Sequence, residues 1–281
     1  MSALKTGILM FAIFALLLLV GGMLGGQQGL IIGFVIALAV NGFAYWFSDK
    51  MVLAMYRAHE VTAEQAPRLH AIVRTLAERA NLPMPKVYVI DSPNPNAFAT
   101  GRNPQHAAVA VTSGILNLLT EDQLSGVIGH ELAHVEHRDI LISTVAATIA
   151  GTISFVASMA KWAAIFGGGG RGRNRANPLA LLVIAFFAPL VALFIKFWIS
   201  RTREYAADAR GAQLAGNPLL LSRALQRLEH GVALHPAEVS PATAHMFIVS
   251  PFNARTITTI FSTHPPIEDR VARLEKMAEA Q

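Results

Sequence analysis

Residues 129–139 read GHELAHVEHRD, and the interpretation of the whole chain follows from this stretch. His130 and His134 stand four residues apart, which puts both on one face of a helix and lets both imidazoles reach one metal ion. Glu131 projects about 100° around the helix, beside that face, where its carboxylate can take a proton from a metal-activated water. Zinc lowers the pKa of such a water to roughly 7, so this transfer is feasible at neutral pH. The spacing therefore predicts a catalytic zinc site.

The chain contains no cysteine, so any metal must be held by nitrogen and oxygen atoms. A catalytic zinc needs a third protein ligand, but the position six residues after His134, where one class of protease has a histidine, is Ile140. His137 would point in too similar a direction to the first two histidines. Glu204 is the better candidate, and Asp208 one turn later could fix the tautomer of a ligating histidine. The alternative, that these two acids pair with arginines of their own helix, stays open.

The composition indicates a membrane protein. Of 281 residues, 53% are hydrophobic and 15% are charged, which is too apolar for an ordinary soluble domain. The excess lies in four stretches, at residues 4–24, 30–47, 140–166 and 178–199, each close to the roughly 20 residues that a helix needs to cross a bilayer. No small-x-small cleavage site clearly follows the first stretch, so it is read as a retained anchor and not as a signal peptide.

These spans divide the chain into four parts. Residues 1–47 hold two transmembrane helices, 48–139 the first half of a catalytic domain, 140–199 a transmembrane hairpin, and 200–281 the second half with the third ligand. Lys and Arg residues collect beside the spans on the side of both catalytic halves, which predicts a cytoplasmic domain; the arginines of residues 167–177 disagree. The net charge of +5 suits an anionic membrane face rather than nucleic acid, because no basic run is interleaved with aromatics.

Local patterns predict the elements of the two catalytic halves. A helix is expected from Thr62, because Thr62 and Gln65 have the pattern of a capping box. Strands are expected at residues 86–90 and 106–114, and the stretch between them, DSPNPNAFATG at 91–101, is dense in turn residues. Thr120 is the expected cap of the helix that carries the histidines. Three further helices are expected at about residues 200–216, 217–234 and 265–281.

Several motifs occur together in an order that resembles the HtpX-like membrane zinc metalloproteases, relatives of the CAAX prenyl protease. They are two N-terminal spans, PNAFATG at residues 95–101, GHELAHVEHRD, a two-span hairpin, SRTREYAADA at 200–209 and STHPPIEDR at 262–270. The resemblance covers nearly the whole chain. The set is far more specific than any one motif.

The resemblance implies an α-helical membrane protein with about four transmembrane helices and a cytoplasmic α+β zincin-like domain, in which an edge strand pairs with extended substrate. We expect residues 107–111 to be that strand. It further implies one Zn²⁺ per chain, a multi-pass location in the bacterial inner membrane, and hydrolysis of misfolded or damaged membrane proteins in quality control and the stress response. Matched position by position, it assigns His130, His134 and Glu204 as zinc ligands, Glu131 as general base, Asp208 as partner of a ligating histidine, Asn96 as a residue of the substrate cleft, and His264 and Arg270 as stabilisers of the tetrahedral intermediate.

Two other classes of protein compete with this reading. An intramembrane metalloprotease also uses His-Glu-x-x-His, but inside a span, whereas charged residues stand at positions 121, 122, 136, 138 and 139 around this motif. A zinc-stabilised membrane scaffold would need a fourth protein ligand, for which His264 or His137 is available. Such a scaffold would have no use for Glu131.

Overall fold

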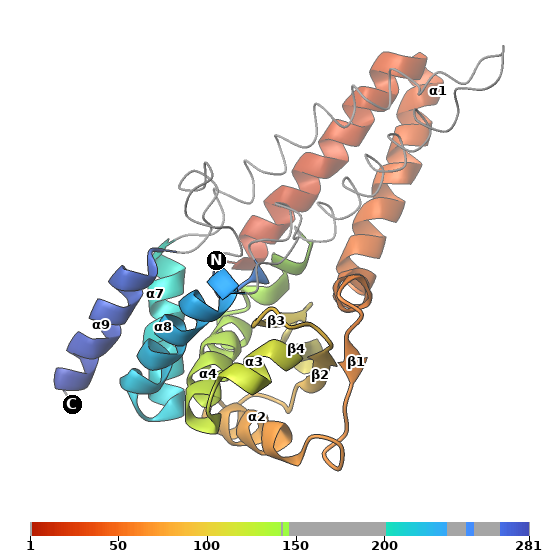
Figure 1. The fold of residues 1–281 in the computed structure, drawn as a ribbon. Helices are drawn as coiled ribbons and strands as arrows, with labels where there is room; N and C mark the ends of the chain where they lie inside the picture. Colours follow the sequence, from red (N-terminus) through yellow and green to blue (C-terminus); the bar gives the residue numbers. More distant parts are fainter. Residues whose placement is uncertain (1, 142, 146–200, 235–245, 250–264, 281) are drawn as a thin grey trace.

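The computed structural model describes residues 2–141, 143–145, 201–234, 246–249 and 265–280 (Figure 1). A long helical arm, α1 (Ser2–Met55), rises from a domain built of one four-stranded sheet and the helices that follow it in the chain. The third and fourth predicted spans lie outside the described residues, apart from residues 140–141 and 143–145. His264 also lies outside them.

The arm is a helical hairpin. Gly26 interrupts α1 with a φ of 55° and a ψ of −135°, between the two stretches that the sequence predicts as spans. Phe14 and Phe34 pack edge to face across the hairpin with ring centroids 5.6 Å apart. Within the described ranges one helix, Gly26–Met55, is long and apolar enough to cross a membrane, with a mean hydropathy of 2.0. This second half of the hairpin continues to Met55 instead of ending near residue 47.

The sheet has the strand order β1-β2-β4-β3. Its strands are β1 (His59–Glu60), β2 (Lys86–Ile90), β3 (Ala97–Gly101) and β4 (Ala107–Thr112). β2 and β4 are parallel, and the other two pairs are antiparallel. Both predicted strands are confirmed, but the expectation that residues 107–111 form an edge is wrong, because β4 lies between β2 and β3. The two edges are β1 and β3. β3 lies in the stretch rich in turn residues and was not predicted as a strand; all five of its residues are buried, and α4 packs against it.

Most helices of the domain begin and end close to the predicted residues. The helices are α2 (Pro67–Arg79), α3 (Ser113–Leu118), α4 (Glu121–Glu136), α7 (Arg201–Ala215), α8 (Pro218–Leu234) and α9 (Ile267–Glu279). α3 was not predicted, and its first two residues lie where a strand was expected. α2 is a second exception: Thr62 and Gln65 form a turn, in which Thr62 N–H donates to Gln65 Oε1 at 2.9 Å, and Pro67 starts the helix as a first-turn proline. At α4 the expected cap Thr120 is confirmed, and it forms a capping box with Gln123, each side chain accepting the other residue's backbone N–H.

α4 is the centre of the domain. It packs against α2, α7, α8 and β3, and Val127, Ile128 and Leu132 on it are fully buried. This enclosure also buries two polar residues of α4, His130 at 1% exposure and Glu131 at 7%. Burying a polar group costs free energy unless a partner compensates it, so His130 and Glu131 are expected to have polar partners nearby.

Candidate metal centre

Two glycines let α4 and α7 touch along their backbones. A Cβ at Gly211 would lie 2.5 Å from His130 N, and one at Gly129 would lie 2.7 Å from Gly211 O. Only a residue without a side chain fits at such distances. The contact sets His130 beside the first half of α7, which carries Glu204 and Asp208.

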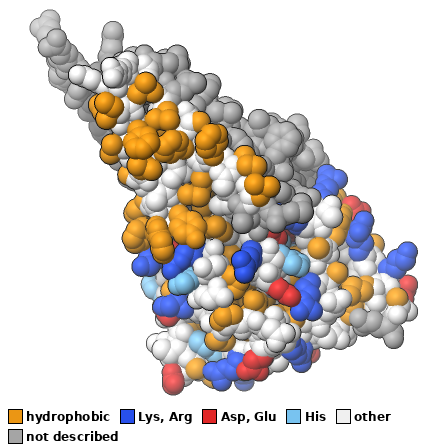
Figure 2. All heavy atoms as spheres, turned by 180° about the vertical axis from the view of Figure 1, so that it is seen from behind, with side chains coloured by type: hydrophobic (Ala, Val, Ile, Leu, Met, Phe, Trp, Pro, Cys, Tyr) orange, Lys and Arg blue, Asp and Glu red, His pale blue; other side chains and the backbone are white. Residues whose placement is uncertain are grey.

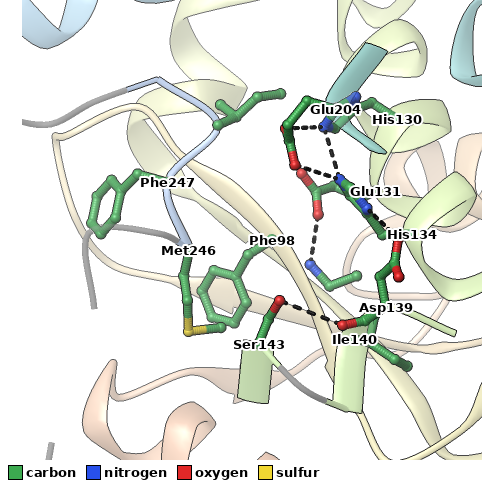
Figure 3. Close-up of a pocket in the computed structure, with 12 residues that line it drawn as sticks. Phe98, His130, Glu131, His134, Asp139, Ile140, Ser143, Glu204, Met246 and Phe247 are labelled. Atoms are coloured by element: carbon green, nitrogen blue, oxygen red, sulfur yellow. Dashed lines mark hydrogen bonds and ion pairs between the residues drawn. The ribbon is translucent and has the colours of Figure 1, made fainter. Parts of the chain in front are cut away.

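Glu204 thereby joins the two histidines of α4 (Figure 3). His130 Nε2 lies 3.2 Å from His134 Nε2, and these nitrogens lie 3.7 Å and 3.6 Å from oxygens of Glu204. Zinc bonds to such ligands are about 2.0–2.1 Å long, so neighbouring ligand atoms of a tetrahedral site are about 3.4 Å apart. The three side chains therefore fit one zinc ion after movements of a few tenths of an ångström.

The outward-facing nitrogen of each histidine points to a carboxylate. His130 Nδ1 lies 2.9 Å from Asp208 Oδ1, and His134 Nδ1 lies 3.6 Å from Asp139 Oδ2. A carboxylate at Nδ1 favours the tautomer with the proton there and a lone pair on Nε2. Two lone pairs and the Glu204 carboxylate then converge, an arrangement that a cation stabilises. Two imidazoles and one carboxylate are a donor set that suits zinc.

The electrostatics of the site also favour a cation. Burial lowers the pKa of His134, but the carboxylates of Glu204, Asp139 and Glu131 outweigh burial and raise the pKa to about 9. With Asp208, four buried carboxylates surround the histidines, while two guanidinium groups pair with them among the described residues. Such a concentration of buried acidic side chains around two histidines favours a bound cation.

Glu131 borders the same pocket without belonging to the three-residue cluster. Its Oε2 accepts a 2.9 Å hydrogen bond from the backbone N–H of Ala99 on β3, so the carboxylate lies between the cluster and the sheet edge. The far side of the pocket is apolar and is formed by Phe98, Met246 and Phe247 (Figure 3). The Glu131 carboxylate, three side chains able to bind a metal ion, and residues of β3 thus face one cavity.

The role of Arg270 in stabilising a reaction intermediate stays a prediction; the structure shows this residue paired with Asp208. The arginine side chain is fully buried, and Nε and Nη2 donate to the two oxygens of Asp208 at 2.8 Å and 2.6 Å. Nη1 donates to Ile248 O at 3.1 Å. Burial raises the pKa of Asp208, but Arg270 outweighs it and holds that pKa well below its usual range. The geometry makes Arg270 the fixed partner of Asp208, which in turn faces His130.

Asn96 is buried behind the pocket wall and does not line the pocket. Its Nδ2 donates to Met246 O at 3.4 Å, and its Oδ1 accepts from the N–H of Ile248 at 3.2 Å. The amide therefore holds the backbone of residues 246–248 as a neighbouring strand would. A contact of Asn96 with substrate stays a prediction; what the structure shows is that it positions Met246 and Phe247.

Within the described part of the chain, two arginines of α7 pair with carboxylates other than Glu204 and Asp208. Arg203 donates to Asp139 and Arg210 donates to Glu136, so both neutralise carboxylates at or just beyond the end of α4. This leaves Glu204 directed at the histidines. Asp139 was not predicted as a site residue, although it stands at the end of the quoted motif; its neighbour Arg138 with a φ of 58° turns the chain back toward His134.

Comparison with known proteins gives matches along the chain. Residues 63–278 match the family described as Peptidase family M48. "Protease HtpX homolog" of Thermodesulfovibrio yellowstonii is 55% identical over 279 residues, which are 99% of both chains. Proteins of the same name from Desulfatibacillum aliphaticivorans and Burkholderia thailandensis are 54% and 52% identical, over 97% and 98% of this chain and 89% and 96% of theirs.

A solved structure shares the fold. The crystal structure of Ste24p from S. mikatae superposes with a TM-score of 0.54 at 20% sequence identity, over 97% of this chain. The matched part is 65% of that longer chain, so this chain spans about two thirds of its length.

Proposed function

Since the chain belongs to peptidase family M48 and is a metallopeptidase, we propose that it is a membrane-bound zinc endopeptidase with His130, His134 and Glu204 as its zinc ligands. The observation that carries this proposal is the convergence of these three side chains beside Glu131 in one pocket. It agrees with the resemblance to the HtpX-like proteases found from sequence motifs.

Each residue of the pocket has a distinct part in the proposed hydrolysis. Bound zinc supplies a Lewis acid for the scissile carbonyl and lowers the pKa of water to roughly 7. Glu131 takes the proton of the attacking water at its carboxylate and later delivers it to the leaving amine. Asp208 and Arg270 hold the ring of His130 in place from behind. The apolar wall excludes water from the reacting bond.

The edge of β3 is the proposed binding place of the substrate backbone. The N–H of Ala99 points away from β4 and toward the pocket, where it donates to Glu131. An extended peptide added to this edge would bind through main-chain hydrogen bonds, which impose little sequence preference. Phe98, Met246 and Phe247 would then select for apolar side chains near the cleaved bond.

We assign the substrates to misfolded or damaged membrane proteins cut at cytoplasmic segments. Support comes from the exposed apolar side chains of α1, which gather on the elongated part of the molecule, whereas charged side chains cover the compact domain (Figure 2). Such a continuous apolar surface is typical of contact with lipid. A catalytic domain joined to it would meet chains emerging from the bilayer, and the Lys and Arg pattern of the sequence favours the cytoplasmic side.

The orientation can be tested because the chain has no cysteine. Gln28 lies at the turn of the α1 hairpin and Asn117 is exposed on α3, so single substitutions Gln28→Cys and Asn117→Cys report opposite sides. In spheroplasts, a membrane-impermeant maleimide should label Gln28→Cys and spare Asn117→Cys until the cells are lysed. Labelling of Asn117→Cys in intact spheroplasts would reverse the assigned orientation.

The catalytic proposal is tested with Glu131→Gln in the full-length protein, purified in detergent and loaded with zinc. We expect one zinc per chain to remain bound and cleavage of β-casein to fall at least a hundredfold, because general base catalysis contributes about 10²–10⁴-fold. Glu136→Gln is the matched control: it makes the same change on α4, where the carboxylate pairs with Arg210. Full activity of Glu131→Gln would exclude the proposed base.

The competing readings make different predictions in this experiment. A zinc scaffold would bind zinc but would cleave nothing, whether or not Glu131 is replaced. The cluster of described residues has three members and does not include His137, whereas His264, the other candidate for a fourth ligand, lies outside the described residues. An intramembrane protease is disfavoured because α4 begins at the cap Thr120 and has exposed acidic residues in its own first turn. α4 also packs against α2, α7, α8 and β3 of the domain.

A further inference from the structure

Each histidine of the cluster has at its Nδ1 a carboxylate that is itself paired with an arginine. The Nδ1 of His130 faces Asp208, which is paired with Arg270, and the Nδ1 of His134 faces Asp139, which is paired with Arg203. We propose that Asp139 is a positioning residue that fixes the ring and tautomer of His134 for metal binding. This inference rests on the proposed zinc site and assigns a role to a residue outside the His-Glu-x-x-His motif.

The chain turns sharply to bring Asp139 under His134. α4 ends at Glu136, Arg138 takes a left-handed φ of 58°, and Asp139 N–H donates to His134 O at 2.9 Å. On an uninterrupted helix, a residue five positions along would lie about 140° away around the axis and could not face the same ring. Left-handed backbone is unfavourable for a residue with a Cβ, so this turn is a specific feature of the fold.

Asp139 is buried, at 6% exposure, and each of its oxygens has one partner. Oδ1 accepts from Arg203 Nη1 at 2.9 Å, and Oδ2 lies 3.6 Å from His134 Nδ1. The second distance is a few tenths of an ångström longer than a hydrogen bond, which a small rotation of the ring would close. Arg203 holds the carboxylate in position. Because Arg203 directly precedes Glu204 on α7, its contact with Asp139 also ties the region of His134 to the helix that carries Glu204.

The competing explanation is that Asp139 and Arg203 form an ion pair that only joins α4 to α7. The substitution Asp139→Asn separates the two explanations, because asparagine has one acceptor and one donor group. Its carbonyl oxygen can still accept from Arg203, while its NH₂ then points at His134 Nδ1. An N–H at that position favours the opposite tautomer, with the proton on Nε2, where the metal must bind.

The test measures zinc affinity by competition with a chelating fluorophore, and the melting temperature in excess chelator, on the full-length protein in detergent. We expect Asp139→Asn to weaken zinc binding 10–100-fold, the usual effect of removing such a partner, while the melting temperature without metal stays within a few degrees. Asp122→Asn, the same change at an exposed position of α4, is the control and should leave both quantities unchanged.

A second variant keeps the proposal testable if Asp139→Asn folds poorly. Arg203→Gln breaks the same ion pair but leaves Asp139 facing His134, so we expect a smaller loss of zinc affinity than for Asp139→Asn. Equal losses in the two variants, or a loss of zinc that only parallels a lower melting temperature in chelator, would overturn the positioning role. Wild-type affinity of Asp139→Asn would do the same. If the wild-type protein itself bound no stoichiometric zinc, the proposed function would fail instead.

Discussion

The close backbone contact between α4 and α7 predicts how much zinc affinity is lost when one methyl group is added at Gly211. In Gly211→Ala the new Cβ would lie 2.5 Å from His130 N and 2.7 Å from His130 Cα. Ordinary contacts of a Cβ begin near 3.4 Å, so the helices must separate by about 0.9 Å. Metal sites tolerate errors of about 0.2 Å in ligand distance, and α7 carries Glu204 while α4 carries both histidines. The substitution should therefore lower zinc affinity by at least tenfold.

The same substitution should lower stability by roughly 1–3 kcal/mol, the usual effect of inserting a methyl group into a packed core. The assays are zinc content after dialysis against a weak chelator and the melting temperature with and without zinc. Gly42→Ala is the control, because nothing lies within 4 Å of a Cβ there. If Gly211→Ala kept a full zinc equivalent with unchanged affinity and melting temperature, the glycine contact would not be what places Glu204 beside His130.

Three further predictions concern the cap, the pocket wall and the metal. Thr120→Ala removes the capping hydrogen bond to Gln123 N–H and should reduce the free energy of unfolding by about 1 kcal/mol, measured by thermal or denaturant unfolding, without changing zinc content. Asn96→Ala removes both bonds to residues 246–248 and should lower kcat/KM for peptide cleavage about tenfold while zinc affinity is retained; equal loss of zinc would place Asn96 in the metal site instead. Removing zinc with a chelator should lower the melting temperature of the wild type, because a ligand that binds only the folded state stabilises it, and should leave Glu204→Ala unaffected.

Most of the helices and the candidate metal site could be predicted from local sequence. His130, Glu131 and His134 share a helix, so their mutual geometry follows from helical spacing alone, and Thr120 marks its start. Glu204 was a candidate from the sequence itself, but its competition with arginine pairing was open. The structure decides it through Gly129 and Gly211, whose meaning appears only when two helices meet.

The sheet edge and the supporting carboxylates were harder to predict. β3 lies in a turn-rich stretch, and its five buried residues form a strand because β4 and α4 cover them, a tertiary effect that outweighs local propensity. In the sequence, Asp139 stands out only as one of the charges flanking the motif. Its role depends on the left-handed conformation of Arg138, for which the residue type gives no signal. Arg270 similarly became a partner of Asp208 only through the docking of α9.

The cluster draws its ligands from distant parts of the chain, and this sets when the enzyme can become active during its synthesis. His130 and His134 are made first, Glu204 follows about seventy residues later, and Arg270, which neutralises Asp208, comes last with α9. At roughly 5–20 residues per second, the interval between the histidines and Glu204 is of the order of seconds. A nascent chain therefore carries half a zinc site while its later segments are still being made. On the proposed assignment of the ligands, the site cannot be complete before α7 and α9 have both been made.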